Sequence, residues 1–271
     1  MYAQAVKSVS VPTQSILFNI DIEGPLTKDK TAVLRVFAKM FYNHCGFYGD
    51  DLKIAKLERF IEKQGKTQQF REAFEKVNGA PWTETRDSFA FFEDDIVSVL
   101  QSTLGMSEQA ARNWFNGEET NELSIAQLVA DIQEYVDGKG KDFRLLFMVD
   151  EVGQYIGDDG DLMINLQSLV EEIGIRCHGK VWVMVTSQEA IDSVVHITGN
   201  DFSKIQGRFN TRLSLSSSSV DEVIKKRVLA KTDAADQLLR MVYDKEHAVL
   251  KNLYTFNNPV LDIKGFTDGA E

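Results

Sequence analysis

Four short apolar segments of the chain have the composition expected of β-strands. Each is rich in branched or aromatic residues, and stretches with apolar residues at helical spacing separate them. The segments are residues 15–22, 144–150, 180–186 and 211–215. Because strands that alternate with helices form parallel sheets, this order predicts an α/β fold. Asp161 is expected to cap the helix that follows the second strand.

The second segment carries the clearest chemical signal. Residues 145–149 are all apolar, and a run without alternation predicts a strand that is buried on both faces. The run leads directly into Asp150 and Glu151, and two carboxylates in that setting need a cation nearby. This is the Walker B pattern of nucleoside triphosphatases, in which the Asp holds Mg²⁺ through water and the Glu polarises the attacking water. The alternative is an ordinary buried strand whose carboxylates are exposed in a loop.

Polar residues also follow the third predicted strand. Thr186 and Ser187 stand at its carboxyl end, which is the edge where open α/β sheets bind ligands. One interpretation is that they contact a γ-phosphate beside Asp150, and the other is that they cap the following segment. Arg208 and Arg212 precede or begin the fourth strand, and the arginine fork suits phosphate oxygens. Arg208 is the stronger candidate, although either arginine taken alone is more typical of a surface salt bridge.

A nucleotide site also needs a glycine-rich phosphate loop, GxxxxGK[ST], between a strand and a helix. The sequence contains no such motif. Residues 24–31 come nearest, but Asp29 takes the place of the second glycine and Pro25 removes a backbone donor. One alternative kept open is a degenerate phosphate loop at this position, with Lys30 on the phosphates. Another is a metal-dependent hydrolase centred on Asp150, for which Asp21 is the clear second carboxylate.

Between residues 49 and 140 the apolar residues recur at helical spacing, and no strand is predicted. That stretch is too long for an ordinary connection, so it predicts a helical insertion between two strands. The predicted parts are a strand and crossover helix of the core (1–48), the helical insertion (49–140), the remaining core (141–231) and a C-terminal helix and tail (232–271).

Composition narrows the classes of function. The formal net charge of −11 and the pI near 5.0 argue against direct binding of a nucleic-acid backbone by this chain. Two cysteines provide no disulfide framework and suit a reducing compartment. No apolar run approaches the roughly 18 residues that span a membrane. A cytoplasmic protein is therefore expected.

Several blocks of the sequence resemble one known family. The similar blocks are FMVDEVGQYIGDDGDLMINLQSLVEEIG, VWVMVTSQEAIDSV and GNDFSKIQGRFNTRLSLSSSSVDEVIKKRVL, with SVPTQSILFNID and GMSEQAARNWFN upstream. They resemble the large P-loop ATPases of the BrxC family, which act in BREX bacteriophage-resistance systems and are related to PglY of phage growth limitation systems. The resemblance runs from about Val9 to about Lys231 and covers most of the chain.

The resemblance implies an AAA+-like ATPase core within a longer polypeptide, with ATP and Mg²⁺ as cofactors. It gives Asp150 and Glu151 the Walker B roles, with Asp150 on Mg²⁺ through water and Glu151 in catalysis. Thr186 or Ser187 matches a sensor position, and Arg208 resembles an arginine finger. The implied partners are a DNA methyltransferase and a phosphatase-like protein, in an assembly whose full-length ATPase forms a homo-oligomer. Any contact with nucleic acid would be made by the assembly.

The chain departs from the family because it lacks the phosphate loop, which in the family lies upstream. We therefore expect a partial P-loop NTPase sheet, an interior fragment that does not turn over ATP alone. Loss of a central strand also predicts exposed strand edges and poor solubility. The open alternative is a non-catalytic helical docking module for partners in the defence complex, with vestigial nucleotide elements.

Overall fold

The computed structural model describes residues 10–187, apart from Leu26, residues 117–122 and Asp158. It also describes six single positions between residues 209 and 230, and residues 231–257. The chain divides into two compact units, Met1–Asn210 and Thr211–Glu271.

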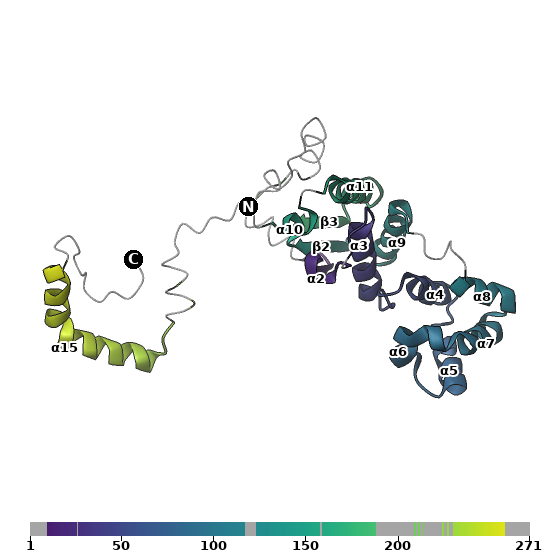
Figure 1. Ribbon diagram of the computed structural model, residues 1–271, viewed down its shortest axis with the longest axis horizontal. Coiled ribbons are helices and arrows are strands. Elements are labelled where there is room, and N and C mark those ends of the chain that lie inside the picture. Colours follow the sequence, from purple (N-terminus) through teal and green to yellow (C-terminus); the bar gives the residue numbers. More distant parts are fainter. Residues whose placement is uncertain are drawn as a thin grey trace. The chain divides into compact units, whose positions relative to one another are not determined.

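Three strands of the first unit form one parallel sheet (Figure 1). They are β1 (Thr13–Asn19), β2 (Arg144–Asp150) and β3 (Val181–Val185), in the order β1-β2-β3. The helices around the sheet are α2 (Ile20–Glu23), α3 (Ala32–His44), α9 (Ile125–Gly138), α10 (Val152–Ile156) and α11 (Gly160–Arg176). The predicted α/β fold with a parallel sheet is therefore confirmed.

Side-chain caps move two of the predicted boundaries. The first strand ends at Asn19 rather than continuing to Ile22, because the Asn19 side chain accepts hydrogen bonds from the backbone of Asp21 and Ile22 and begins α2. Helix α11 is capped by Asp159 and not by Asp161. The predicted fourth strand lies mostly outside the described residues, and the two of its positions that are described are not in a strand.

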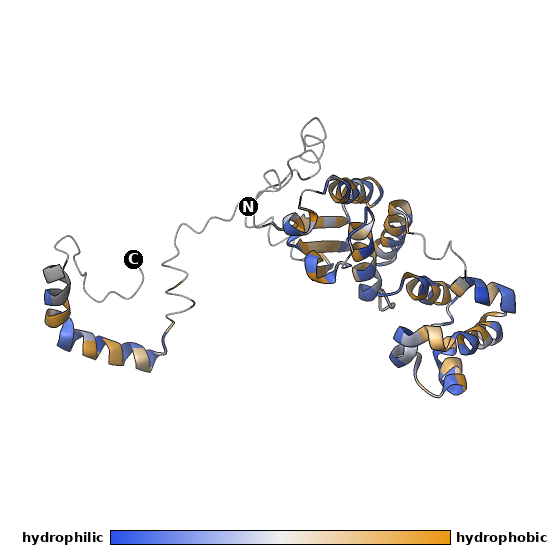
Figure 2. Ribbon diagram, viewed as in Figure 1, coloured by the Kyte–Doolittle hydropathy of each residue, from blue (hydrophilic) through white to orange (hydrophobic). Residues whose placement is uncertain are grey.

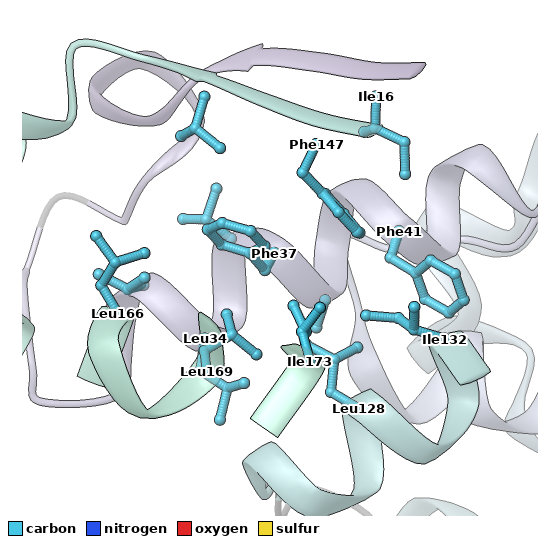
Figure 3. Packing of buried hydrophobic residues seen from close by; sticks show 14 of the residues in the cluster. Ile16, Leu34, Phe37, Phe41, Leu128, Ile132, Phe147, Leu166, Leu169 and Ile173 are labelled. Carbon is cyan, nitrogen blue, oxygen red and sulfur yellow. The ribbon is translucent and has the colours of Figure 1, made fainter. Parts of the chain in front are cut away.

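The core of the first unit lies between one face of the sheet and three helices. Helices α3 and α9 both pack against α11. Phe37 of α3 meets Phe18 of β1 edge to face, with ring centroids 5.4 Å apart, and its ring lies 5.3 Å from that of Phe147 of β2. Figure 3 shows Phe37, Phe147 and Leu166 pointing into the same apolar space. Burial of such aromatic and aliphatic side chains supplies most of the driving force for folding.

The opposite face of the sheet is exposed. Leu17, Trp182 and Met184 are 69%, 61% and 50% exposed, while Leu146 and Met148 are half-buried. The prediction that β2 is buried on both faces is thus wrong for the described residues. Connections between parallel strands are almost always right-handed, and both connections here step in the same direction across the sheet. Their helices therefore belong on the same face.

A second apolar core lies within the long connection between β1 and β2. It belongs to α4 (Leu52–Lys63), α5 (Thr67–Asn78), α6 (Trp82–Thr85), the 3₁₀ helix η1 (Arg86–Phe91), α7 (Glu93–Leu104) and α8 (Glu108–Asn116). The buried Glu58 carboxylate accepts hydrogen bonds from Trp82 Nε1 at 2.7 Å and Arg86 Nη1 at 2.9 Å. Trp82 packs against Phe70 and Phe74. We call α4 to α8 the helical module.

A buried ionic network joins the helical module to the sheet layer. Arg59 of α4 pairs with the buried Asp131 of α9 and also with Glu134. Asp131 accepts a further hydrogen bond from the Tyr42 hydroxyl of α3 at 2.8 Å. Because Asp131 is buried, it needs these donors, and removing Arg59 would leave its charge uncompensated.

In the second unit the structure describes a long helix, α15 (Asp233–Asn257). Figure 1 shows that this helix is bent. In the part of the chain that the structure describes, no helix is both long and apolar enough to cross a lipid bilayer.

Leu17 and Ile16 are neighbours on β1 that face opposite sides of the sheet, so they test the exposure of the open face. Leu17→Thr is expected to change the free energy of unfolding by no more than about 0.5 kcal/mol, because that side chain is already in water. Ile16→Thr is the matched control. It removes a side chain that is only 4% exposed, and a loss of about 2–4 kcal/mol is expected. Urea unfolding followed by circular dichroism measures both, and equal losses would show that the Leu17 face is covered.

Candidate functional site

The polar ends of the three strands meet at one edge of the sheet. Parallel pairing places Asn19 of β1 opposite Asp150 of β2, and Val149 opposite Val185, which immediately precedes Thr186. The sequence predicted that Asp150, Glu151 and Thr186 would lie together, and the structure brings them together. Ligands bind at this carboxyl edge in open α/β sheets.

Asp150 and Thr186 are joined directly. The Thr186 hydroxyl donates a hydrogen bond to Asp150 Oδ1, and the Glu151 backbone N–H lies 3.1 Å from the same oxygen. That N–H also lies 3.3 Å from Thr186 Oγ1. The Thr186 backbone extends the ladder, since its N–H donates to Val149 at 2.9 Å and its carbonyl accepts from Val152 at 3.0 Å. Thr186 therefore ties the end of β3 to the start of α10.

Glu151 has an unusual backbone conformation. Its φ of 60° and ψ of 30° lie in the left-handed region, which disfavours residues with a side chain by about 1–2 kcal/mol. Its carboxylate is oriented by Asn19, whose Nδ2 donates to Glu151 Oε2 at 3.0 Å. Strained backbone of this kind persists only where the surroundings hold it, and it is concentrated at functional sites.

Asn19 is a site residue that the sequence analysis missed. Its Oδ1 accepts from the N–H groups of Asp21 at 2.9 Å and Ile22 at 3.2 Å, so its amide NH₂ must face the other way, toward Glu151. The one signal in the sequence was a polar residue near the end of a predicted strand. This signal could have been used only if the strand had been expected to end at Asn19, three residues before the predicted boundary at Ile22.

Ser187 and Tyr155 present polar atoms to the interior. Among the described residues, the Ser187 hydroxyl and the Tyr155 hydroxyl are buried without a hydrogen-bond partner. Burial raises the pKa of Tyr155, and the nearby Asp21 and Asp29 raise it further. Ser187 lies next to Thr186 at the end of β3, so both predicted sensor residues belong to this edge.

The loop formed by residues 24–31 does not have the form of a phosphate cradle. Asp29 accepts from the Thr31 backbone at 2.7 Å and from the Thr31 hydroxyl at 2.6 Å, and these bonds lower the pKa of Asp29. A Cβ on Gly24 would come within 2.6 Å of the Tyr155 ring. The lysine that approaches α10 is Lys28, which donates to the Tyr155 carbonyl at 2.8 Å. In the described part of this loop, the Thr31 N–H, the Lys28 ammonium group and the space beside Gly24 are thus taken by groups of the protein.

Among the described residues, no group of three or more histidine, cysteine or carboxylate side chains could hold a metal ion. A hydrolase with its own metal cluster would need such a group. Mg²⁺ that arrives with a nucleotide needs only one or two carboxylates, because phosphates and water fill its other positions. Asp150 suits that role: its Oδ1 is engaged by Thr186 and Glu151, and the residue is exposed.

Arg208 and Arg212 lie outside the described residues. The neighbouring Phe209 is described, and it is half-buried against the core of the sheet layer.

No protein-family model matches this chain, and no solved structure matches it. The resemblance to the BrxC family therefore stays a prediction from the sequence blocks. An α/β sheet does not by itself decide a function, because such folds support many activities.

The strain at Glu151 predicts an inverted order of stability between two substitutions. Glu151→Gly and Glu151→Ala both remove the contact with Asn19, but glycine adopts the left-handed conformation freely. The free energy of unfolding of Glu151→Gly is expected to be about 1 kcal/mol higher than that of Glu151→Ala. Urea titration measures both values. Asp150, which has ordinary strand geometry, is the control. There Asp150→Ala should be more stable than Asp150→Gly. A Glu151→Ala variant as stable as Glu151→Gly would contradict the left-handed conformation.

Proposed function

We propose that this chain forms the Walker B and sensor edge of an AAA+-like ATPase that acts in BREX bacteriophage defence. In this proposal the chain binds ATP with Mg²⁺ and contributes to ATP hydrolysis when a phosphate-loop segment is present. The observation that carries the proposal is the cluster of Asp150, Glu151 and Thr186 at the ends of two adjacent parallel strands. Thr186 is hydrogen-bonded to Asp150, and Glu151 is held by Asn19. The sequence blocks that resemble the family contain these residues.

The roles follow from where the groups lie. Asp150 would hold Mg²⁺ through water, and the ion would neutralise charge on the phosphates. Glu151 would take the proton of the attacking water. Thr186 and Ser187, at the end of the neighbouring strand, would contact the γ-phosphate.

Two further groups complete the proposed site. Arg208 and Arg212 would bind triphosphate oxygens through their planar forks. Asn19 would be a positioning residue, because its amide donates to the carboxylate of Glu151.

The family supplies the setting of the proposal. The protein would be cytoplasmic and would work with a methyltransferase and a phosphatase-like protein. The full-length ATPase would form a homo-oligomer. The net charge of −11 leaves binding of nucleic acid to other parts of the assembly.

A second function is favoured by one observation, the separate apolar core of the helical module. A module with its own core can present a docking surface to defence partners without any nucleotide chemistry. Capture of those partners by the helical module alone (residues 52–116), with no effect of Glu151→Gln on defence, would favour this function over the first.

The purified chain is expected to show no ATP hydrolysis above background, because it has no phosphate loop. The rate of hydrolysis is measured as phosphate released from ATP in the presence of Mg²⁺. Lys30→Ala is expected to leave the affinity of the chain for ATP unchanged, since residues 24–31 are not a cradle for phosphate. Hydrolysis by the chain alone that disappears in Glu151→Gln would contradict this prediction.

The proposed roles are tested in a polypeptide that joins this chain to a phosphate-loop segment of the family. Glu151→Gln is expected to lower the rate of ATP hydrolysis by ~10²–10⁴-fold and to leave ATP binding intact, because only the base is lost. Asn19→Asp keeps the cap of α2 but places a carboxylate against Glu151, and hydrolysis should fall there as well. Asp21→Asn, two residues further on, is the matched control and should retain full activity. Loss of activity in Asp21→Asn would instead support the metal-dependent hydrolase.

A further inference from the structure

Helix α10 is short, and Glu151 stands at its start. The helix has five residues, Val152–Ile156, and Glu151 is its N-cap in the left-handed conformation. A helix of this length is not stable on its own in water, so its neighbours must hold it in place. Helices α2 and α10 follow β1 and β2 and contact each other, and both mix apolar with polar residues (Figure 2). The position of the Glu151 carboxylate therefore depends on what holds α10.

The segment that follows β1 contacts α10 at both of its ends. At the start of the helix, the Asn19 amide donates to the Glu151 carboxylate at 3.0 Å. At the other end, Lys28 Nζ donates to the Tyr155 carbonyl at 2.8 Å. Carbonyls in the last turn of a helix have no partner within the helix, and a lysine can supply the missing donor. Asn19 and Lys28 thus hold opposite ends of the same short helix.

The Lys28 ammonium group makes two further contacts in this position. It lies 3.8 Å from Asp21 Oδ1 of α2 and 4.0 Å from the centroid of the Tyr155 ring of α10. An ammonium group has three donors, and its charge is also attracted to the face of an aromatic ring. Lys28 therefore connects α2 with the C-terminal end of α10.

The packing around Tyr155 leaves α10 little room to shift. Tyr155 is 2% exposed, and a Cβ on Gly24 would lie 2.6 Å from its ring and 2.8 Å from the Ile20 carbonyl oxygen. The φ of Gly24 is −72°, which any residue can adopt, so close packing is what requires a glycine here. Among the described residues, the Tyr155 hydroxyl is buried without a hydrogen-bond partner. Packing and the contacts of Lys28, and not that hydroxyl, hold Tyr155 in place.

We propose that Lys28 is a positioning residue for Glu151. It holds the end of α10 against α2 while Asn19 holds the start, and the two contacts together fix the direction of the Glu151 carboxylate. This role rests on the proposed function, in which Glu151 takes the proton of the attacking water. It differs from the role of a phosphate-binding lysine, because the ammonium group of Lys28 is directed at α2 and α10 and not at ATP.

The coupling between Lys28 and Glu151 is measured on the chain itself by carbon-13 NMR of glutamate-labelled protein. The Glu151 carboxyl resonance is the one that is lost in Glu151→Gln. Lys28→Met keeps the apolar stem and removes the ammonium group, so it is expected to shift this resonance. It should also speed amide exchange in the last turn of α10 at least ~10-fold. Amide exchange in β2 should stay unchanged, which distinguishes a displaced helix from an unfolded chain.

Three further variants separate position from charge. Lys30→Met removes the same charge two residues further along the loop and should leave the Glu151 resonance in place. Gly24→Ala displaces the Tyr155 ring without a change of charge and should shift the resonance. Lys28→Arg keeps a charged donor and should return the resonance toward its wild-type position.

Kinetics test the role in the ATPase that joins this chain to a phosphate-loop segment. Lys28→Met should lower kcat by ~10-fold and change the KM for ATP by less than about twofold. A kcat that stays at the wild-type value, or a KM that rises instead, would overturn the proposal. So would a Glu151 resonance that Lys28→Met leaves in place. If the resonance shifts but Glu151→Gln keeps full activity, the proposed function fails and the coupling of Lys28 to Glu151 stands.

Discussion

The parallel pairing of β2 with a strand on each side is the interaction on which the site depends. Backbone hydrogen bonds fix the register of all three strands, so Asn19 stands opposite Asp150 and Thr186 follows the pair of Val149 and Val185. A slip of one residue would turn the buried side chains of a strand to the other face. Burial of Phe147 on the covered face therefore sets the register, and the register places the polar ends of the strands within hydrogen-bonding distance.

The same connectivity explains how the long insertion leaves the sheet intact. The helical module lies within the connection between β1 and β2, and its apolar side chains form a core of their own. It does not compete for the covered face of the sheet, which α3, α9 and α11 occupy. The buried pair of Arg59 and Asp131 is one attachment between the module and that layer. An ion pair suits such a junction, because its geometry fixes an orientation that apolar contacts alone would specify less strictly.

How much the sequence could predict differed from element to element for physical reasons. The bounds of β2 were predicted correctly, because an unbroken apolar run followed by charges marks both ends of a strand. The end of β1 was missed, because the Asn19 side chain starts a helix within a stretch that still has the composition of a strand. The pairing of Asn19 with Glu151 joins residues 132 positions apart and appears only once the strands are in register. The open face was missed because apolar composition shows what can be buried and not what covers it.

At Glu151 the local preference of the backbone conflicts with the residue that occupies it. A left-handed position at the end of a strand is one that glycine fills without strain, and a glutamate there raises the energy of the folded state. Hydrogen bonds hold it: its backbone N–H to Asp150, and its carboxylate to the Asn19 amide. A carboxylate merely exposed in a loop would need neither the strain nor the fixed orientation. A strained and oriented carboxylate, directly after the one that ends β2, therefore favours a chemical role for this edge over an ordinary turn.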